Sequence, residues 1–203
     1  MEMVAWKVMI VVNKLNIDVM KKLIVLIVFI SACMSVYSQV NYNSFVGTWV
    51  YQKNDTVFKI RLQKGTKIIA SRSYESLFGG YFLSVSGVVT DNYIEGAIPS
   101  VWDVNSPAPS NNIYIAVYYN DELPSLQGFK LYDQRKKHLN GEGIGGGEIE
   151  LIAPNKIHWT LNEREGLWPW LEGERIEGEN LPTIEESIQG FSVPTDVIMI
   201  KEE

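Results

Sequence analysis

From residue 47 onward, apolar and polar residues alternate in short runs, a period that is typical of β-strands. The clearest run spans 57–63 and places Phe58, Ile60 and Leu62 on one face. Turn-forming residues separate several runs, among them Asn54-Asp55 and Thr90-Asp91-Asn92. The runs lie at 47–51, 57–63, 81–85, 93–94, 113–119, 128–132, 148–152, 156–162 and 197–201. No segment keeps a 3.6-residue period with caps, so we expect no long helix.

This pattern predicts an all-β fold, a single antiparallel β-barrel of about eight or nine strands in one domain spanning 39–203. A barrel of eight strands holds its own side chains or one small ligand. The side chains expected to face inward are bulky, which favours a filled interior. They are Phe58, Ile60, Leu62, Leu83, Ile149, Leu151, Trp159 and Leu161. The acidic segment 163–195 is expected to be a long loop with a functional role or high mobility.

The segment ahead of the strands has the three parts of a secretory signal. Met20-Lys21-Lys22 precedes the apolar run 23–30, and small residues follow. We therefore predict a signal peptide over 20–38, cleaved between Ser38 and Gln39. Residues 1–19 are interpreted as an upstream extension that results from a start codon assigned too early.

A second route of processing stays open at this segment. Ile30-Ser31-Ala32-Cys33 resembles a bacterial lipobox, in which Cys33 is lipidated and becomes the new N-terminus. Either route predicts an extracytoplasmic protein, which is secreted, periplasmic or at the cell surface, or else anchored through Cys33. The apolar run is too short for a permanent span, so we expect no transmembrane segment in the mature chain.

Composition excludes several classes of function. The 203 residues include 18 Lys and Arg and 24 Asp and Glu, which gives a net charge of −6. Removal of residues 1–38 changes this balance to 14 − 22 = −8. An acidic chain without a basic patch is not expected to bind nucleic acid. One Cys and two His leave few ligands for a metal site, so we expect no metal. We also expect no other cofactor and a monomeric protein.

The start of the first strand run carries a resemblance. Phe45-Val46-Gly47-Thr48-Trp49 resembles the opening motif of lipocalin-like barrels, in which a Gly-x-Trp marks the first strand. More specifically, the chain resembles a family of small, secreted, uncharacterised lipocalin-like proteins of flavobacteria and their relatives. The further shared segments are Ser38-Gln39, Gly79-Gly80-Tyr81, 156–162, Glu165-Gly166 and 191–196. The resemblance implies a fold and an export route, and it implies that Trp49 plugs one barrel end, often with an Arg against its ring.

Motifs for catalysis are weak. The string 141–146 satisfies G-x-G-x-x-G, but a strand rather than a helix is expected to follow it, so we predict a hairpin loop. His158 is expected on the outer face of its strand, and His138 in a solvated basic turn. The acidic cluster 172–179 is expected to be a solvated charge run. There is no Gly-x-Ser-x-Gly motif, so we predict no catalytic residue and no enzyme activity.

Three tryptophans are candidate contacts for a ligand or partner. Trp168-Pro169-Trp170 places two indoles in a loop, and Trp102 lies in the Pro- and Ser-rich segment 99–112. The alternative is that these rings cover a barrel opening. Because Trp168 and Trp170 are separated by one residue, we expect one ring to pack on the barrel and the other to face outward.

These observations favour an exported, non-enzymatic, lipocalin-like protein that binds a small apolar or amphipathic ligand. The alternative is an envelope structural or interaction protein whose barrel is filled by its own side chains and holds no ligand.

Overall fold

The computed structural model describes residue 22 and residues 41–118, 123–162 and 190–202. The part from Val40 onward is one compact unit. From residue 41 on, the described residues form β-strands and three short 3-10 helices, and none of them lies in an α-helix. No helix among the described residues is both long and apolar enough to cross a membrane.

The described residues of this unit form ten strands and three 3-10 helices. The strands are β1 (Gly47–Lys53), β2 (Thr56–Ile69), β3 (Arg72–Val85), β4 (Val88–Asn92), β5 (Val101–Asp103), β6 (Ile115–Val117), β7 (Leu126–Leu131), β8 (Ile144–Ala153), β9 (Lys156–Leu161) and β10 (Asp196–Lys201). The 3-10 helices are η1 (Tyr42–Ser44), η2 (Pro109–Asn111) and η3 (His138–Gly141).

Eight of the strands close into an antiparallel barrel. Their order is β1-β2-β3-β6-β7-β8-β9-β10, and β10 pairs again with β1 through Trp49↔Lys201 and Val50↔Ile200. Each strand is therefore hydrogen-bonded to the next barrel strand along the chain, as in an up-and-down barrel. The predicted all-β barrel is confirmed.

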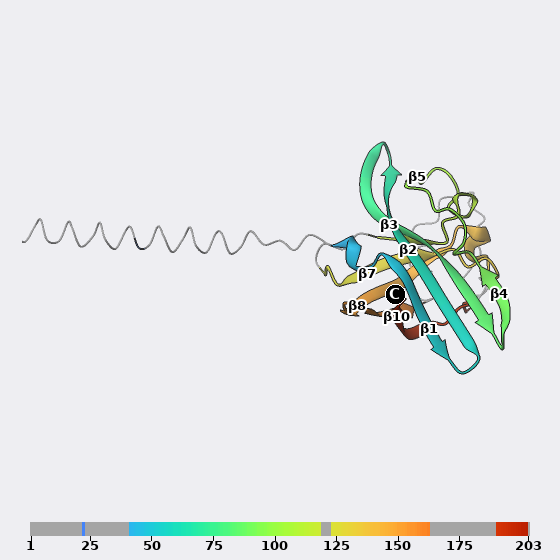
Figure 1. Cartoon of the computed structure of the whole chain (residues 1–203). Helices are drawn as coiled ribbons and strands as arrows, with labels where there is room; N and C mark the ends of the chain where they lie inside the picture. The colour runs from blue at the N-terminus through green and yellow to red at the C-terminus, as the bar shows by residue number, and fades with distance from the viewer. Residues whose placement is uncertain (1–21, 23–40, 119–122, 163–189, 203) are drawn as a thin grey trace, which may run out of the picture. The chain divides into compact units, whose positions relative to one another are not determined.

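The two remaining strands attach to β2 and β3, which are the longest strands at 14 residues each. β4 pairs with the end of β3, and β5 runs parallel to β2 along Thr66–Ile68. Figure 1 shows the β2–β3 hairpin rising beyond the rest of the barrel, with β5 near it. The extended hairpin and β5 were not expected from the sequence.

The β3–β4 turn differs from the prediction. Thr90-Asp91-Asn92 was expected to be a turn, but these residues lie in β4, where Asp91 and Asn92 pair with β3 and the register shifts at Thr90. The turn lies instead at Ser86-Gly87, where both residues have positive φ, as a tight two-residue hairpin requires. The expected strand 93–94 lies beyond the end of β4, so that prediction was also wrong.

The barrel interior is filled by large side chains. Seven of the eight side chains expected to face inward are buried, and Leu151 is half-buried against them. Trp159 lies at the centre of this packing, with its ring stacked on Phe129 at 4.2 Å and edge-on to Phe58 at 5.5 Å. Because protein interiors pack at nearly crystalline density, these rings leave little room for a guest.

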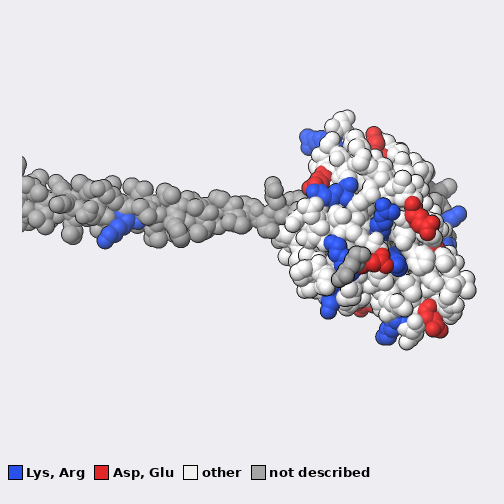
Figure 2. All heavy atoms as spheres, viewed as in Figure 1, with Lys and Arg blue, Asp and Glu red and all other residues white. Residues whose placement is uncertain are grey.

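A second apolar cluster lies on the outer wall of the barrel. It consists of Phe78, Ile98, Trp102, Ala108, Ile113, Ala116 and Tyr132. Neighbouring residues in β6 explain the division, because Ile115 and Val117 belong to the barrel core while Ala116 points the other way. The segment between β4 and β6 covers this part of the wall. On the face drawn in Figure 2, basic and acidic side chains are interspersed over the described surface.

Candidate ligand-binding site

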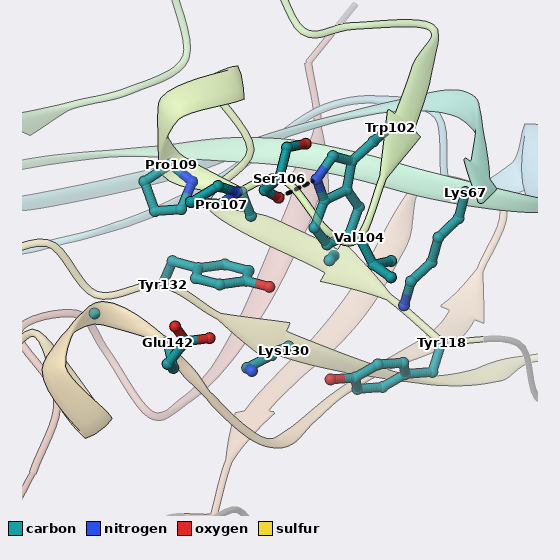
Figure 3. A pocket seen from close by; sticks show the side chains of 13 residues that line it. Lys67, Trp102, Val104, Ser106, Pro107, Pro109, Tyr118, Lys130, Tyr132 and Glu142 are labelled. Atoms are coloured by element: carbon teal, nitrogen blue, oxygen red, sulfur yellow. Dashed lines mark hydrogen bonds between the residues drawn. The ribbon is translucent and has the colours of Figure 1, made fainter. Parts of the chain in front are cut away.

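A cavity of about 200 Å³ lies between the outer wall of the barrel and the segment that carries β5 and η2. Strands β2, β6 and β7 and the end of η3 supply its other walls (Figure 3). Its lining consists of Lys67, Trp102, Val104, Ser106, Pro107, Ala108, Pro109, Ala116, Tyr118, Lys130, Tyr132, Gly141 and Glu142. We call it the side-wall pocket.

Trp102 forms a fixed wall of the side-wall pocket. Its side chain is 5% exposed, and its indole Nε1 donates a hydrogen bond of 2.9 Å to the carbonyl oxygen of Ser106. The ring also meets Phe78 edge-on, with 5.7 Å between ring centroids. Because these contacts determine the orientation of the indole, the wall is formed before any ligand arrives.

Two lysines point into the pocket. The Nζ of Lys67 lies 5.0 Å from the ring centroid of Tyr118 and 5.5 Å from that of Trp102. The Nζ of Lys130 lies 5.5 Å from the ring of Tyr132. Within the described residues neither ammonium group forms an ion pair with a carboxylate. Contacts with aromatic rings partly compensate both charges.

Burial changes the titration of these groups. Desolvation lowers the pKa of Lys67, and the charge of Lys130 lowers it further. Desolvation also lowers the pKa of Lys130, while the carboxylate of Glu142 acts in the opposite direction. Burial raises the pKa of Tyr118 to about 12 and raises that of Tyr132 as well. Both phenols therefore stay neutral and can donate a hydrogen bond at physiological pH.

The charge of the lining is positive. Lys67 and Lys130 contribute two positive charges, and Glu142 contributes the one negative charge among the lining residues. Glu142 is exposed, so water screens its carboxylate more than it screens the half-buried ammonium groups. The side-wall pocket is thus suited to a small anion that also has an apolar body.

Comparison with known proteins gives a family. The model of a family of unknown function (DUF6705) matches residues 20–202. The chain belongs to this family. No curated protein and no solved structure matches the chain. Membership of an uncharacterised family, which the sequence predicted, is confirmed.

Among the candidate tryptophans, Trp102 lies in the wall of the side-wall pocket. Trp168 and Trp170 lie outside the described residues, as do the cleavage pair Ser38 and Gln39 and the alternative lipidation residue Cys33. The ligand contacts, the cleavage site and the lipidation site predicted at these residues remain predictions. The same holds for the role of the acidic segment up to residue 189.

Sequence reasoning missed four residues of the pocket, Lys67, Tyr118, Lys130 and Tyr132. Each lies on or beside a strand at a position that faces away from the barrel core, where a polar or amphipathic residue suggests exposure to solvent. The nearest signal in the sequence is Trp102 in its Pro-rich segment, but it gives no indication of these four residues.

The Gly47-Thr48-Trp49 motif lies at the start of β1. The Trp49 side chain is fully buried, and its Nε1 donates a hydrogen bond of 2.8 Å to the carbonyl oxygen of Phe45. The cation on its ring is Lys201, at 5.2 Å from the ring centroid, rather than an arginine. Trp49 thus joins η1, β1 and β10 at the closure of the barrel.

The two histidines differ from each other. His158 faces outward as expected, and its Nε2 lies 2.7 Å from a carboxylate oxygen of Asp196. The expectation of a solvated His138 was wrong, because this side chain is 1% exposed and packs on Phe191. A left-handed Lys137 turns the chain inward at this point, and the His138 Nε2 is 2.9 Å from the Gly190 carbonyl oxygen.

The glycine string 141–146 is only partly a loop. η3 ends at Gly141, and β8 begins at Ile144, earlier than the sequence predicted. No helix follows the string, so it lacks the helix N-terminus that a dinucleotide site requires. No group of three or more metal-ligating side chains occurs within the described residues.

Two buried carboxylates at the β4 and β7 ends were also missed. Asp133 accepts hydrogen bonds from the backbone of Arg135 and Lys136 and from Ser192. Asp91 lies 3.5 Å from a guanidinium nitrogen of Arg135 and accepts a hydrogen bond from the Thr90 hydroxyl. The Asp91–Arg135 contact and the hydrogen bonds from Ser192 to Asp133 join segments that are distant in the chain.

Proposed function

We propose that this protein is an exported, non-enzymatic, lipocalin-like barrel that binds a small molecule in the side-wall pocket. The observation that carries the proposal is the pocket itself, in which three aromatic residues surround two ammonium groups that form no ion pair with a carboxylate among the described residues. The lipocalin-like assignment is supported by eight barrel strands in up-and-down order and by a buried Trp49 with a cation on its ring.

Binding of a ligand in the barrel interior is disfavoured by the packing of its side chains. Trp49, Phe58, Phe129 and Trp159 are all fully buried in one cluster that fills the interior. A ligand there would have to displace large rings at a cost of several kcal/mol, as for overpacking of a core. The side-wall pocket needs no such displacement, so we assign the ligand to it.

Saturation-transfer NMR with the full chain and a library of small neutral, anionic and cationic compounds tests this function. The informative variant is Val104→Trp, because Val104 lines the pocket and a larger side chain there fills it. Val88→Trp is the matched control, since Val88 is 64% exposed at the β3–β4 turn. We expect compounds that bind the natural chain and the control but not Val104→Trp.

Two outcomes would contradict the proposal. If no compound in the library binds and native mass spectrometry of protein from its native cell finds no small molecule, the pocket is not a ligand site. If compounds bind equally to Val104→Trp, they bind elsewhere. Thermal melts of both variants establish that each is folded.

The absence of catalysis is supported by the side chains that line the pocket. They include no histidine or cysteine, and Glu142 is the one carboxylate. The hydroxyl of Ser106 donates a hydrogen bond to the Asp103 carbonyl rather than to a base. We expect panels of hydrolase and glycosidase substrates to show no turnover. A reproducible turnover that a Lys67→Met or Lys130→Met change abolishes would overturn this part of the proposal.

A second candidate, an envelope interaction protein, is favoured by the filled barrel together with apolar side chains at the β3–β4 turn. Val85, Val88 and Val89 are 42%, 64% and 55% exposed there. A photo-cross-linking residue at Val88 in the native cell should yield a discrete protein adduct if this candidate is correct. A residue at Thr195, which is also exposed, serves as the control position.

A further inference from the structure

The two lysines of the side-wall pocket define what kind of molecule it accepts. Lys67 lies on β2 and Lys130 lies on β7, and these two strands are not neighbours in the barrel. Both side chains are half-buried, and the charge on one affects the titration of the other. Figure 3 shows both amines directed into the same space, which the rings of Trp102, Tyr118 and Tyr132 border.

Two like charges close together in a partly dry site are unfavourable unless an anion joins them. Here the cost is reduced by aromatic faces and by Glu142, but no acid forms an ion pair with either lysine among the described residues. An anionic ligand between the amines would stabilise both in their charged form. The phenol groups of Tyr118 and Tyr132 also point into the pocket in Figure 3.

The other residues that line the pocket favour a ligand with an apolar, planar body. Trp102 and Tyr132 offer rings, and Val104, Pro107 and Pro109 offer aliphatic surface. A cavity of about 200 Å³ is somewhat larger than the ~150 Å³ apolar cavity that holds benzene and smaller than the ~300–1,000 Å³ of drug-sized sites. This volume suits one aromatic ring with a short acidic substituent.

We propose that the side-wall pocket binds a single-ring aromatic carboxylate, with the carboxylate between Lys67 and Lys130 and the ring between Trp102 and Tyr132. This inference rests on the proposed binding function and narrows the ligand to one chemical class. The phenol of Tyr118 or Tyr132 donates a hydrogen bond to the same carboxylate, or to a hydroxyl on the ring.

Isothermal titration of the full chain with 4-hydroxybenzoate and with 4-hydroxybenzamide tests the proposal. The two probes have nearly the same shape and differ in charge. We expect the acid to bind at least about tenfold more tightly than the amide, because a hydrogen bond to a charged group is roughly twice as strong as a neutral one. Lys67→Met and Lys130→Met should each weaken binding of the acid by about tenfold and leave binding of the amide nearly unchanged.

Lys64→Met is the matched control. Lys64 lies on the same strand as Lys67 but is exposed, forms an ion pair with Glu75, and does not line the pocket. We expect this variant to bind the acid as the natural chain does. Methionine preserves most of the length of the lysine side chain, so thermal melts should show that all three variants fold.

The possible outcomes separate this inference from the proposed function. Equal binding of acid and amide, or equal losses in Lys64→Met and Lys67→Met, would overturn the carboxylate assignment and leave the pocket as a binding site. The carboxylate assignment would also fail if neither probe binds but another compound binds the natural chain and not Val104→Trp. The pocket would then still be a binding site. If no compound of any class binds, the proposed function fails together with the inference.

Discussion

Asp133 and Ser192, which are 59 residues apart in the sequence, are joined by two hydrogen bonds of 2.7 Å. The backbone N–H and the hydroxyl of Ser192 both donate to the buried Asp133 carboxylate. This contact joins Ser192 to the residues that follow β7, and Trp159 adds a contact nearby by donating to the Pro194 carbonyl oxygen at 2.9 Å. The residues just before β10 are thereby attached to the end of the barrel.

Asp133→Ala should lower the free energy of unfolding by about 3 kcal/mol, because it removes the charged acceptor of four hydrogen bonds, three from backbone N–H groups and one from the Ser192 hydroxyl. Ser192→Ala removes one hydroxyl and should cost about 1 kcal/mol. Urea unfolding of both variants measures the difference. Equal and small losses would mean that the contact does not contribute to stability.

Trp49→Ala should cost about 3–5 kcal/mol, as for other fully buried aromatic residues. Lys201→Met keeps the apolar contact with the Trp49 ring and removes only the cation, so its cost should stay within about 1 kcal/mol. Thermal melts of the two variants test the assignment. A larger loss for Lys201→Met than for Trp49→Ala would contradict the view that packing dominates at this motif.

Stability should fall as the pH rises above 10, through the ionisation of buried phenols. Burial raises the pKa of Tyr118 from 10.0 to about 12 and also raises the pKa values of Tyr132 and Tyr81. In this range the folded chain binds more protons than the unfolded chain, so unfolding becomes easier with increasing pH. Below pH 10 this contribution is fully present.

Urea midpoints measured from neutral pH to pH 12, together with the ultraviolet absorbance of tyrosinate, test the alkaline prediction. Tyr132→Phe should show a smaller loss between pH 10 and 12 than the natural chain. Tyr74→Phe is the control, because Tyr74 is 45% exposed. A titration in which all ten tyrosines ionise together near pH 10 would contradict the prediction.

N-terminal sequencing of the exported protein should begin at Gln39, if the signal peptide spans 20–38 as the sequence predicts. Cys33→Ser should leave export and processing unchanged in that case. Incorporation of labelled palmitate that depends on Cys33 would instead establish a lipid-anchored form.

The sequence predicted the barrel because its strands alternate with the correct period. Phe58, Ile60 and Leu62 are all buried on one face of β2, as the pattern required. The prediction from the sequence failed where backbone geometry determines the local structure. The Ser86-Gly87 turn depends on positive φ at both residues, and Asp91 is polar but buried because Arg135 lies beside it.

The side-wall pocket could not be predicted because it depends on contacts between distant segments. Lys67 and Lys130 are 63 positions apart, and each is on an outward face that normally meets water. Only the fold of the segment between β4 and β6 onto this wall converts them into pocket residues. Trp102 was singled out from its residue type and its loop, but nothing in the sequence connected it with two lysines.

The pairing of β1 with β10 has a consequence for the rate and the hazards of folding. Trp49 and Lys201 are opposite each other in the sheet although almost the whole domain separates them in the chain. Such non-local pairing slows folding to the range of milliseconds to seconds. Until β10 is in place, β1 and β9 each present a row of unpaired backbone groups, and unpaired edges promote aggregation between chains. A chain that lacks this final strand should therefore accumulate in inclusion bodies rather than as a soluble intermediate.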